Sequence, residues 1–171
     1  LNHVLGAAYL SMGRLERGVE IIARNFTGEH DSETEYPARC HGISVLPLRA
    51  LGRHEDAEHH FRNACRMIAQ NPVYIRETAA LVAYAALVGD APTLLGLLQH
   101  HLEWAATNFD RWSSMRLYIV AAWALDQLGG PISLWLHEDV PGHQADGRYD
   151  STELAASLRY AGLELARRFD A

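Results

Sequence analysis

Apolar residues, mainly alanine and leucine, recur at three- and four-residue spacing along most of the chain, which is typical of amphipathic helices. Four such segments each end in a glycine. These are Gly13, Gly52, Gly89 and Gly129, at intervals of 39, 37 and 40 residues. A terminal glycine takes the left-handed conformation that stops a helix, so the next helix can turn back. The pattern therefore predicts helix–turn–helix units that repeat about every forty residues.

A single helix pair cannot bury its apolar face alone, so neighbouring pairs must cover it. The predicted fold class is all-α, with about four antiparallel helix pairs in a single domain, 1–171. The approximate units are 1–26, 38–72, 74–108 and 112–171. The sequence begins at Leu1 rather than Met, which suggests one section of a longer protein.

The first unit resembles a tetratricopeptide (TPR) repeat. The residues at the spacing of that family are Leu5, Gly6, Tyr9, Gly13, Gly18 and Ile22. The second unit matches in its second helix, at Gly52, Ala57, Phe61 and Ala64. The resemblance covers about residues 1–130, and its intervals exceed the usual 34 residues. It implies a TPR-like right-handed α-solenoid in which the first helix of each unit lines a concave surface.

Three local features modify this picture. Pro47 is expected to kink the first helix of the second unit or to delay its start. The connections at 27–38 and 131–150 are long, and we expect the second to be functional, mobile or edge-capping. After it, Asp150 is positioned to cap a helix, with Glu153 three residues on as in a capping box.

The stretch 50–68 holds three histidines, which raises the hypothesis of a metal site. A helical zinc hydrolase needs H-E-x-x-H, but Glu58 stands where the second histidine should follow His54. His60 is predicted on the face opposite His54 and Glu58, so three imidazoles cannot converge from this helix alone. We therefore favour a solvated polar face, with no metal and no cofactor. The loop residues His137, Glu138, Asp139 and His143 form a weaker alternative metal set.

Two cysteines are too few for a disulfide framework, and a reducing cytoplasm is expected. Cys40 and Cys65 should lie level on neighbouring helices of a hairpin that turns near residue 52. We favour two small buried thiols over a redox-formed bridge.

Net charge and apolar content exclude several classes of partner. The net charge is -6, and nucleic-acid binders usually carry the opposite balance. No apolar run reaches the roughly 18 residues of a membrane span, and nothing marks the chain for export. All fifteen basic residues are arginine, whose planar fork suits carboxylates.

The resemblance places a set of residues on the concave surface. Arg39, Arg76 and Arg116 occupy equivalent positions, 13 residues before successive glycines. Deeper positions are Leu46, Arg49, Ala83, Ile119 and Trp123. In some TPR domains, basic residues near this place hold the terminal carboxylate of a peptide. The predicted site is therefore Arg39, Arg49, Arg76, Arg116 and Trp123, binding an acidic or C-terminal peptide segment.

These inferences favour a non-catalytic scaffold that binds protein or peptide and is not an enzyme. Three alternatives remain open. The chain could be the peptide- or ligand-sensing portion of a bacterial regulator. It could be a metal-dependent enzyme that uses the 131–150 loop. It could also form a homodimer through exposed edge helices.

Overall fold

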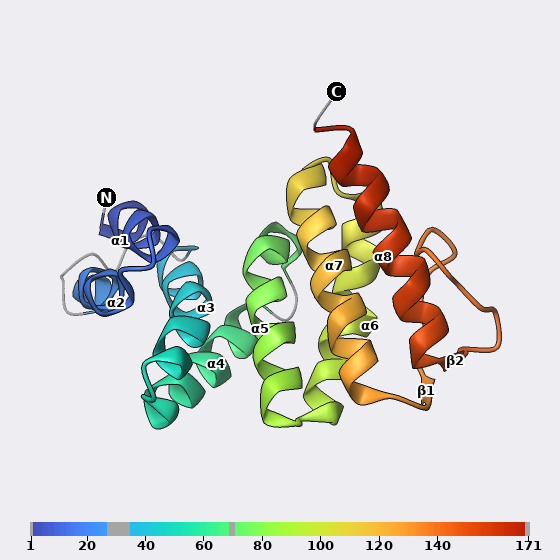
Figure 1. Ribbon diagram of the computed structural model, residues 1–171, viewed down its shortest axis with the longest axis horizontal. Helices are drawn as coiled ribbons and strands as arrows, with labels where there is room; N and C mark the ends of the chain where they lie inside the picture. Colours follow the sequence, from blue (N-terminus) through green and yellow to red (C-terminus); the bar gives the residue numbers. More distant parts are fainter. Residues whose placement is uncertain (1, 27–34, 69–70, 170–171) are drawn as a thin grey trace. The chain divides into compact units, whose positions relative to one another are not determined.

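The computed structural model describes residues 2–26, 35–68 and 71–169, and most of these residues are helical (Figure 1). This confirms the all-α class. The chain divides into two compact units, Leu1–Ala69 and Gln70–Ala171. Among the described residues, none of the helices combines the length and apolar content needed to cross a membrane.

The first unit contains four α-helices and one short 3₁₀ helix. They are α1 (Asn2–Ser11), α2 (Leu15–Ala23), η1 (Arg24–Phe26), α3 (Glu35–Ala50) and α4 (His54–Ile68). Each α-helix contacts the next one along the chain. α1 and α2 are closely packed at two glycines. A Cβ atom on Gly6 would lie only 3.0 Å from the carbonyl oxygen of Gly18. Of the predicted connection 27–38, residues 27–34 lie outside the described residues, and the rest belong to α3.

The second unit contains four α-helices, a 3₁₀ turn and a two-stranded hairpin. They are η2 (Pro72–Tyr74), α5 (Ile75–Val88), α6 (Ala91–Thr107), α7 (Arg111–Leu128), β1 (Pro131–Ser133), β2 (Arg148–Asp150) and α8 (Ser151–Arg167). α7 contacts α5, α6 and α8, and α5 also contacts α6. Figure 1 shows α7 between α5 and α8, in front of α6.

All four glycines predicted to end helices have positive φ, between 67° and 74°. After Gly13, Gly52 and Gly89, the next residue donates its N–H to the carbonyl five positions back. This bond is the mark of a Schellman cap. Gly129 differs, because its ψ of 157° leads the chain into β1 instead of directly into a second helix. Three of the turns are therefore alike, and the fourth opens into the connection between α7 and α8.

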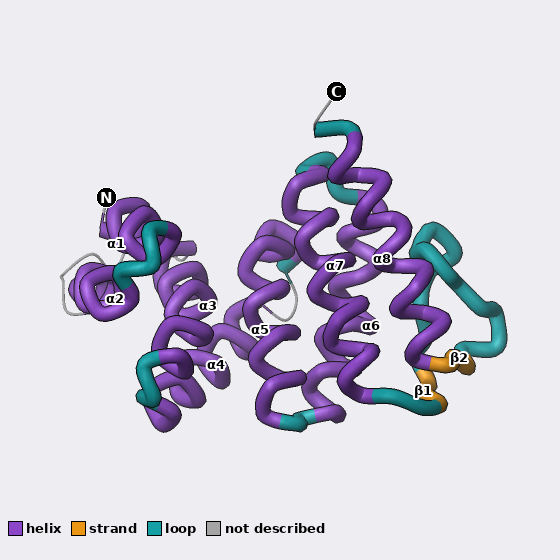
Figure 2. The backbone as a smooth tube through the Cα atoms, viewed as in Figure 1, coloured by secondary structure: helices purple, strands orange, loops and turns teal. Residues whose placement is uncertain are grey.

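The connection between α7 and α8 is a packed hairpin. β1 and β2 pair antiparallel, with Ile132 opposite Tyr149 (Figure 2). Ile132, Leu134, Leu136, Val140 and Tyr149 are all buried. The structure thus favours the edge-capping alternative, because this segment contributes to the core of the second unit.

Aspartates cap three helices of the second unit. Asp90, Asp110 and Asp150 each accept a hydrogen bond from a backbone N–H in the first turn of α6, α7 and α8. The cap at Asp150 confirms the predicted start of the last helix. Pro47 lies inside α3 near its end, so the helix does not start late.

Candidate functional site

One face of α7 carries two of the predicted binding residues. Arg116, Val120, Trp123 and Gln127 follow the spacing that places side chains on one face of a helix. All four are exposed or half-exposed, and Trp123 is 37% exposed. Among the described residues, the guanidinium of Arg116 has no hydrogen-bond or ion-pair partner. α7 thus presents a cation and an aromatic ring, two turns apart, to solvent.

The neighbouring helix α5 carries an arginine at the equivalent position, forty residues earlier in the sequence, but has alanine where α7 has Trp123. Arg76, Ala80, Ala83 and Leu87 correspond in order to the four residues on α7, and none of them is buried. α5 and α7 are in contact, and the two stripes occupy equivalent positions on them. We call these eight residues the α5–α7 face.

The start of this face carries a local electrostatic contact. Asp110 caps α7, and hydrogen bonds from Ser113 are the main reason that its carboxyl pKa lies below the usual value. The positive charge of Arg76 makes a smaller contribution in the same direction. Arg76 is therefore close enough to Asp110 to be partly neutralised, whereas Arg116 is not.

Ile119, which the sequence places deeper in the predicted groove, lies close to α8. A Cβ atom on Gly162 would lie only 2.8 Å from Cδ1 of Ile119, so the isoleucine packs in part against α8. It remains 37% exposed.

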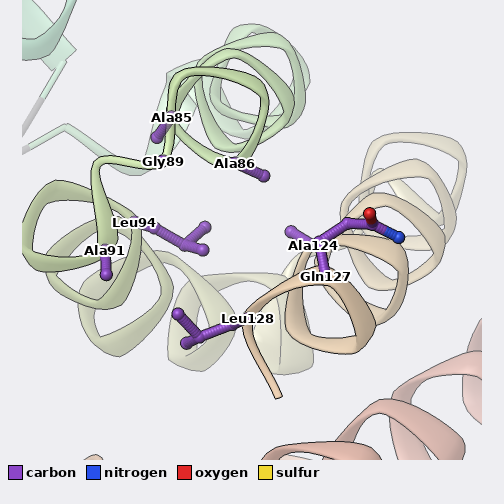
Figure 3. A pocket seen from close by; sticks show the side chains of 8 residues that line it. All are labelled: Ala85, Ala86, Gly89, Ala91, Leu94, Ala124, Gln127 and Leu128. Carbon is purple, nitrogen blue, oxygen red and sulfur yellow. The ribbon is translucent and has the colours of Figure 1, made fainter.

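A small apolar pocket of about 110 Å³ opens beside the C-terminal end of the α5–α7 face. Its lining residues come from α5, the turn after it, α6 and α7, namely Ala85, Ala86, Gly89, Ala91, Leu94, Ala124, Gln127 and Leu128. Figure 3 shows Leu94 and Leu128 pointing into this space, while the amide of Gln127 points away from it. Gln127 belongs to both the pocket and the α5–α7 face. The pocket is large enough for one aliphatic side chain.

The remaining predicted residues, Arg39 and Arg49, lie on α3 in the first unit. Both are half-buried. The charge of Arg39 contributes to lowering the pKa of His3, after burial and the N-terminal charge, so Arg39 lies near α1. These two arginines thus take part in contacts of their own unit. In the second unit, Arg116 and Trp123 lie on α7, and Arg76 lies on α5, which contacts α7.

The acidic and histidine residues of the 131–150 segment lie at its surface. His137 and Asp139 form an exposed pair, with 3.2 Å between Nδ1 and Oδ2. Glu138 and His143 are exposed as well. Across residues 2–26, 35–68 and 71–169, no group of three His, Cys, Asp or Glu side chains is arranged to hold a metal ion.

A histidine cluster in the first unit was missed by considering one helix at a time. His41 of α3 and His60 of α4 place their Nδ1 atoms 2.9 Å apart. The ring of His59 lies 6.3 Å from that of His41 and 5.8 Å from that of His60, between centroids. Phe26 covers the pair, with its centroid 4.6 Å from His41 and 5.2 Å from His60. We call His41, His59 and His60 the histidine cluster.

Burial keeps the histidine pair neutral. It lowers the pKa of His41 to about 4, and the charges of His60, His59 and Arg66 add to the effect. The pKa of His60 is also lowered, first by burial and then by His59 and Arg53, although Asp56 opposes the shift. A neutral pair can share one proton, with one Nδ1–H donating to the other Nδ1.

We expect the stability of the protein to fall as the pH is lowered from about 6.5 to 4, measured in EDTA by denaturant unfolding. Unfolded His41 takes up a proton near pH 6.5, whereas the folded residue resists until about pH 4. Acid in this window therefore favours the unfolded chain, by about 1.4 kcal/mol per pH unit for this one group. His41→Gln should flatten this dependence, and His54→Gln, at an exposed site on α4, should not. Equal slopes for both variants would contradict the assignment.

The two described cysteines are thiols and not halves of a disulfide. Cys40 is buried, and burial raises the pKa of its thiol to about 11. Cys65 is only half-buried, so the prediction of two buried thiols holds for Cys40 alone.

The α5–α7 face and the histidine cluster are thus the two candidate sites that we consider among the described residues. Comparison with family models, with curated proteins and with solved structures found no match to this chain. Membership of the TPR family therefore stays a prediction from the sequence.

Proposed function

We propose that this chain is a non-catalytic scaffold of the TPR-like, right-handed solenoid type, which binds a protein or peptide on the α5–α7 face. The observation that carries the proposal is the repetition on α5 and α7. Two first helices in contact present an arginine at the same position of one stripe, and the stripe on α7 continues with Val120 and Trp123. The three similar Schellman turns also support a repeated unit.

The chemistry of the face favours a peptide that carries a carboxylate. Arg116 is half-exposed and has no partner among the described residues, so its planar guanidinium is available for a bidentate contact. Arg76 adds a second, partly neutralised cation. Trp123 supplies the aromatic surface that often dominates binding energy. The proposed partner segment is therefore acidic, or ends in a free carboxylate.

The geometry of α7 sets the length of the partner segment. Eleven residues separate Arg116 from Gln127, which is about 17 Å at 1.5 Å per residue. An extended peptide covers this distance with about five residues. A carboxylate at Arg116 would therefore place a side chain about five residues away at the pocket beside Gln127. An aliphatic residue fits that pocket best, since its lining is mostly apolar.

A peptide library tests the proposal. Random octapeptides with a free C-terminal carboxylate, and the same library with amidated ends, are screened against the whole chain. We expect selection of free-carboxylate or acidic sequences that carry an aliphatic residue about five positions from the carboxylate. For a selected peptide, Arg116→Glu should weaken binding by about tenfold or more, because it replaces an attractive pair by a repulsive one. Trp123→Ala should have an effect of similar size.

The matched control is Arg148→Glu, which makes the same charge change at an exposed arginine on β2. It should leave the affinity within about twofold. An equal loss in Arg148→Glu would show that only net charge matters. Unchanged affinity in both Arg116→Glu and Trp123→Ala would overturn the assignment of the face.

A further inference from the structure

The histidine cluster has the chemistry of a metal chelate that neither the fold nor the proposed peptide binding requires. Two imidazole nitrogens from different helices face each other at 2.9 Å, and a third imidazole lies beside them. Neutral imidazole is a ligand for divalent copper, nickel and zinc. The pair is held in place by burial of His41, which is 8% exposed, and by the ring of Phe26.

The two Nδ1 atoms are close enough to bind one metal. Their 2.9 Å separation is the length of an N–H···N hydrogen bond. Two nitrogens bound to one metal at about 2.0–2.1 Å lie about 2.9–3.3 Å apart, so a metal could replace the proton with little movement of either ring. Imidazole nitrogen and water oxygen in tetragonal coordination suit Cu²⁺ and Ni²⁺, and Cu²⁺ binds such ligands most strongly among divalent first-row metals.

We infer that His41 and His60 form a two-imidazole site for a tetragonal divalent metal, Cu²⁺ or Ni²⁺, which would link α3 to α4. The described residues contain no three-ligand set, so water completes the coordination. The metal takes the place of the proton shared between the two Nδ1 atoms. The ring that donated this proton keeps its neutral charge by carrying a hydrogen on Nε2 instead.

The surroundings of the pair favour the metal-binding form of both rings. Metal ligands must be deprotonated, and a lowered pKa removes competition from protons at neutral pH. Of the nearby guanidiniums, Arg53 pairs with Asp56 at 2.7 Å, which offsets its charge. Arg66 donates to the neutral side chain of Asn63 at 2.6 Å, so its charge remains and opposes a cation at the pair. A metal ion would reach the two Nδ1 atoms from the side of α4, where His60 is half-buried and His59 is exposed.

The test uses the whole chain, stripped with EDTA and then dialysed. Titration with Ni²⁺ by calorimetry should give one site per chain. One equivalent of Cu²⁺ should give an electron paramagnetic resonance spectrum with coupling to imidazole nitrogen. His60→Gln should lower the affinity for both metals by at least about tenfold. His41→Gln should do the same if it folds, and His60→Gln suffices if it does not, because His60 is only half-buried.

The matched control is His54→Gln, an exposed histidine on the same helix, which should bind both metals as the original chain does. His59→Gln should retain the nitrogen coupling. Equal losses in His54→Gln and His60→Gln would mean scattered surface binding and would overturn the site. Loss in His59→Gln with full retention in His41→Gln would place the metal on exposed imidazoles of α4, and would also overturn it.

Discussion

Replacing Leu125 by alanine is expected to lower the free energy of unfolding by about 2–5 kcal/mol. Leu125 is fully buried on α7, the helix that contacts α5, α6 and α8. The substitution removes apolar contacts and leaves a cavity that close-packed neighbours fill only in part. Denaturant unfolding followed by far-ultraviolet circular dichroism measures the loss.

The control is the same chemical change at Leu163 on α8, which is 48% exposed. Leu163→Ala should cost about 0.5 kcal/mol or less, because its side chain loses little burial. Similar losses for both variants would contradict the central position of α7 in the second unit. A folded Leu125→Ala variant should also bind the selected peptide more weakly, since α7 carries Arg116 and Trp123.

Leu134→Ala is expected to destabilise the protein by about 2–5 kcal/mol as well, although it lies in a segment between two helices. Leu134 is 2% exposed, and its backbone N–H donates to the carbonyl oxygen of Gly147 at 3.0 Å. The side chain is therefore part of the core. Thermal and denaturant unfolding should both show the change.

The adjacent residue provides the control. Trp135 is 71% exposed, and its backbone N–H, which alanine retains, donates to Oε1 of Gln99 on α6. Trp135→Ala should cost about 1 kcal/mol or less, despite removing the larger side chain. A loss in Trp135→Ala that exceeds the loss in Leu134→Ala would mean that the alternation of buried and exposed positions is wrong.

The helices were predictable because their signals are local. Apolar periodicity, terminal glycines and capping aspartates act within a few residues, so the ends of the helices could be read along the chain. Asp150 and Gly89 are examples, each with the expected cap in the structure. The placement of Arg116 and Trp123 on a binding face came instead from the resemblance to TPR repeats and stays a prediction.

The packing of the 131–150 segment was not predicted, although a signal exists. Ile132, Leu134 and Leu136 alternate with exposed residues, as in a half-buried strand. Trp135 lies at an exposed position within this run and makes it resemble a continuous apolar stretch. The burial of the segment depends on neighbours outside it, such as α6, whose Gln99 accepts a hydrogen bond from the backbone N–H of Trp135.

The histidine cluster lay beyond sequence reasoning for a different reason. His41 and His60 are 19 residues apart on two helices, so their contact depends on how α3 and α4 cross. The antiparallel pairing expected for Cys40 and Cys65 also brings other positions of the same two helices together, among them His41, next to Cys40, and His60, five residues before Cys65. Testing every such pair of positions across a predicted hairpin would have indicated the contact.

The pairing of β1 with β2 brings the two ends of the 131–150 segment together, with Pro131 opposite Asp150. α8 therefore begins close to the end of α7, as it would after a short turn. The segment between them starts and ends at nearly the same place. Its exposed tip, at Glu138 and Asp139, is a natural place to graft an epitope or a fluorescent label. Lengthening that tip would cost little closure entropy and would leave the start of the last helix in place.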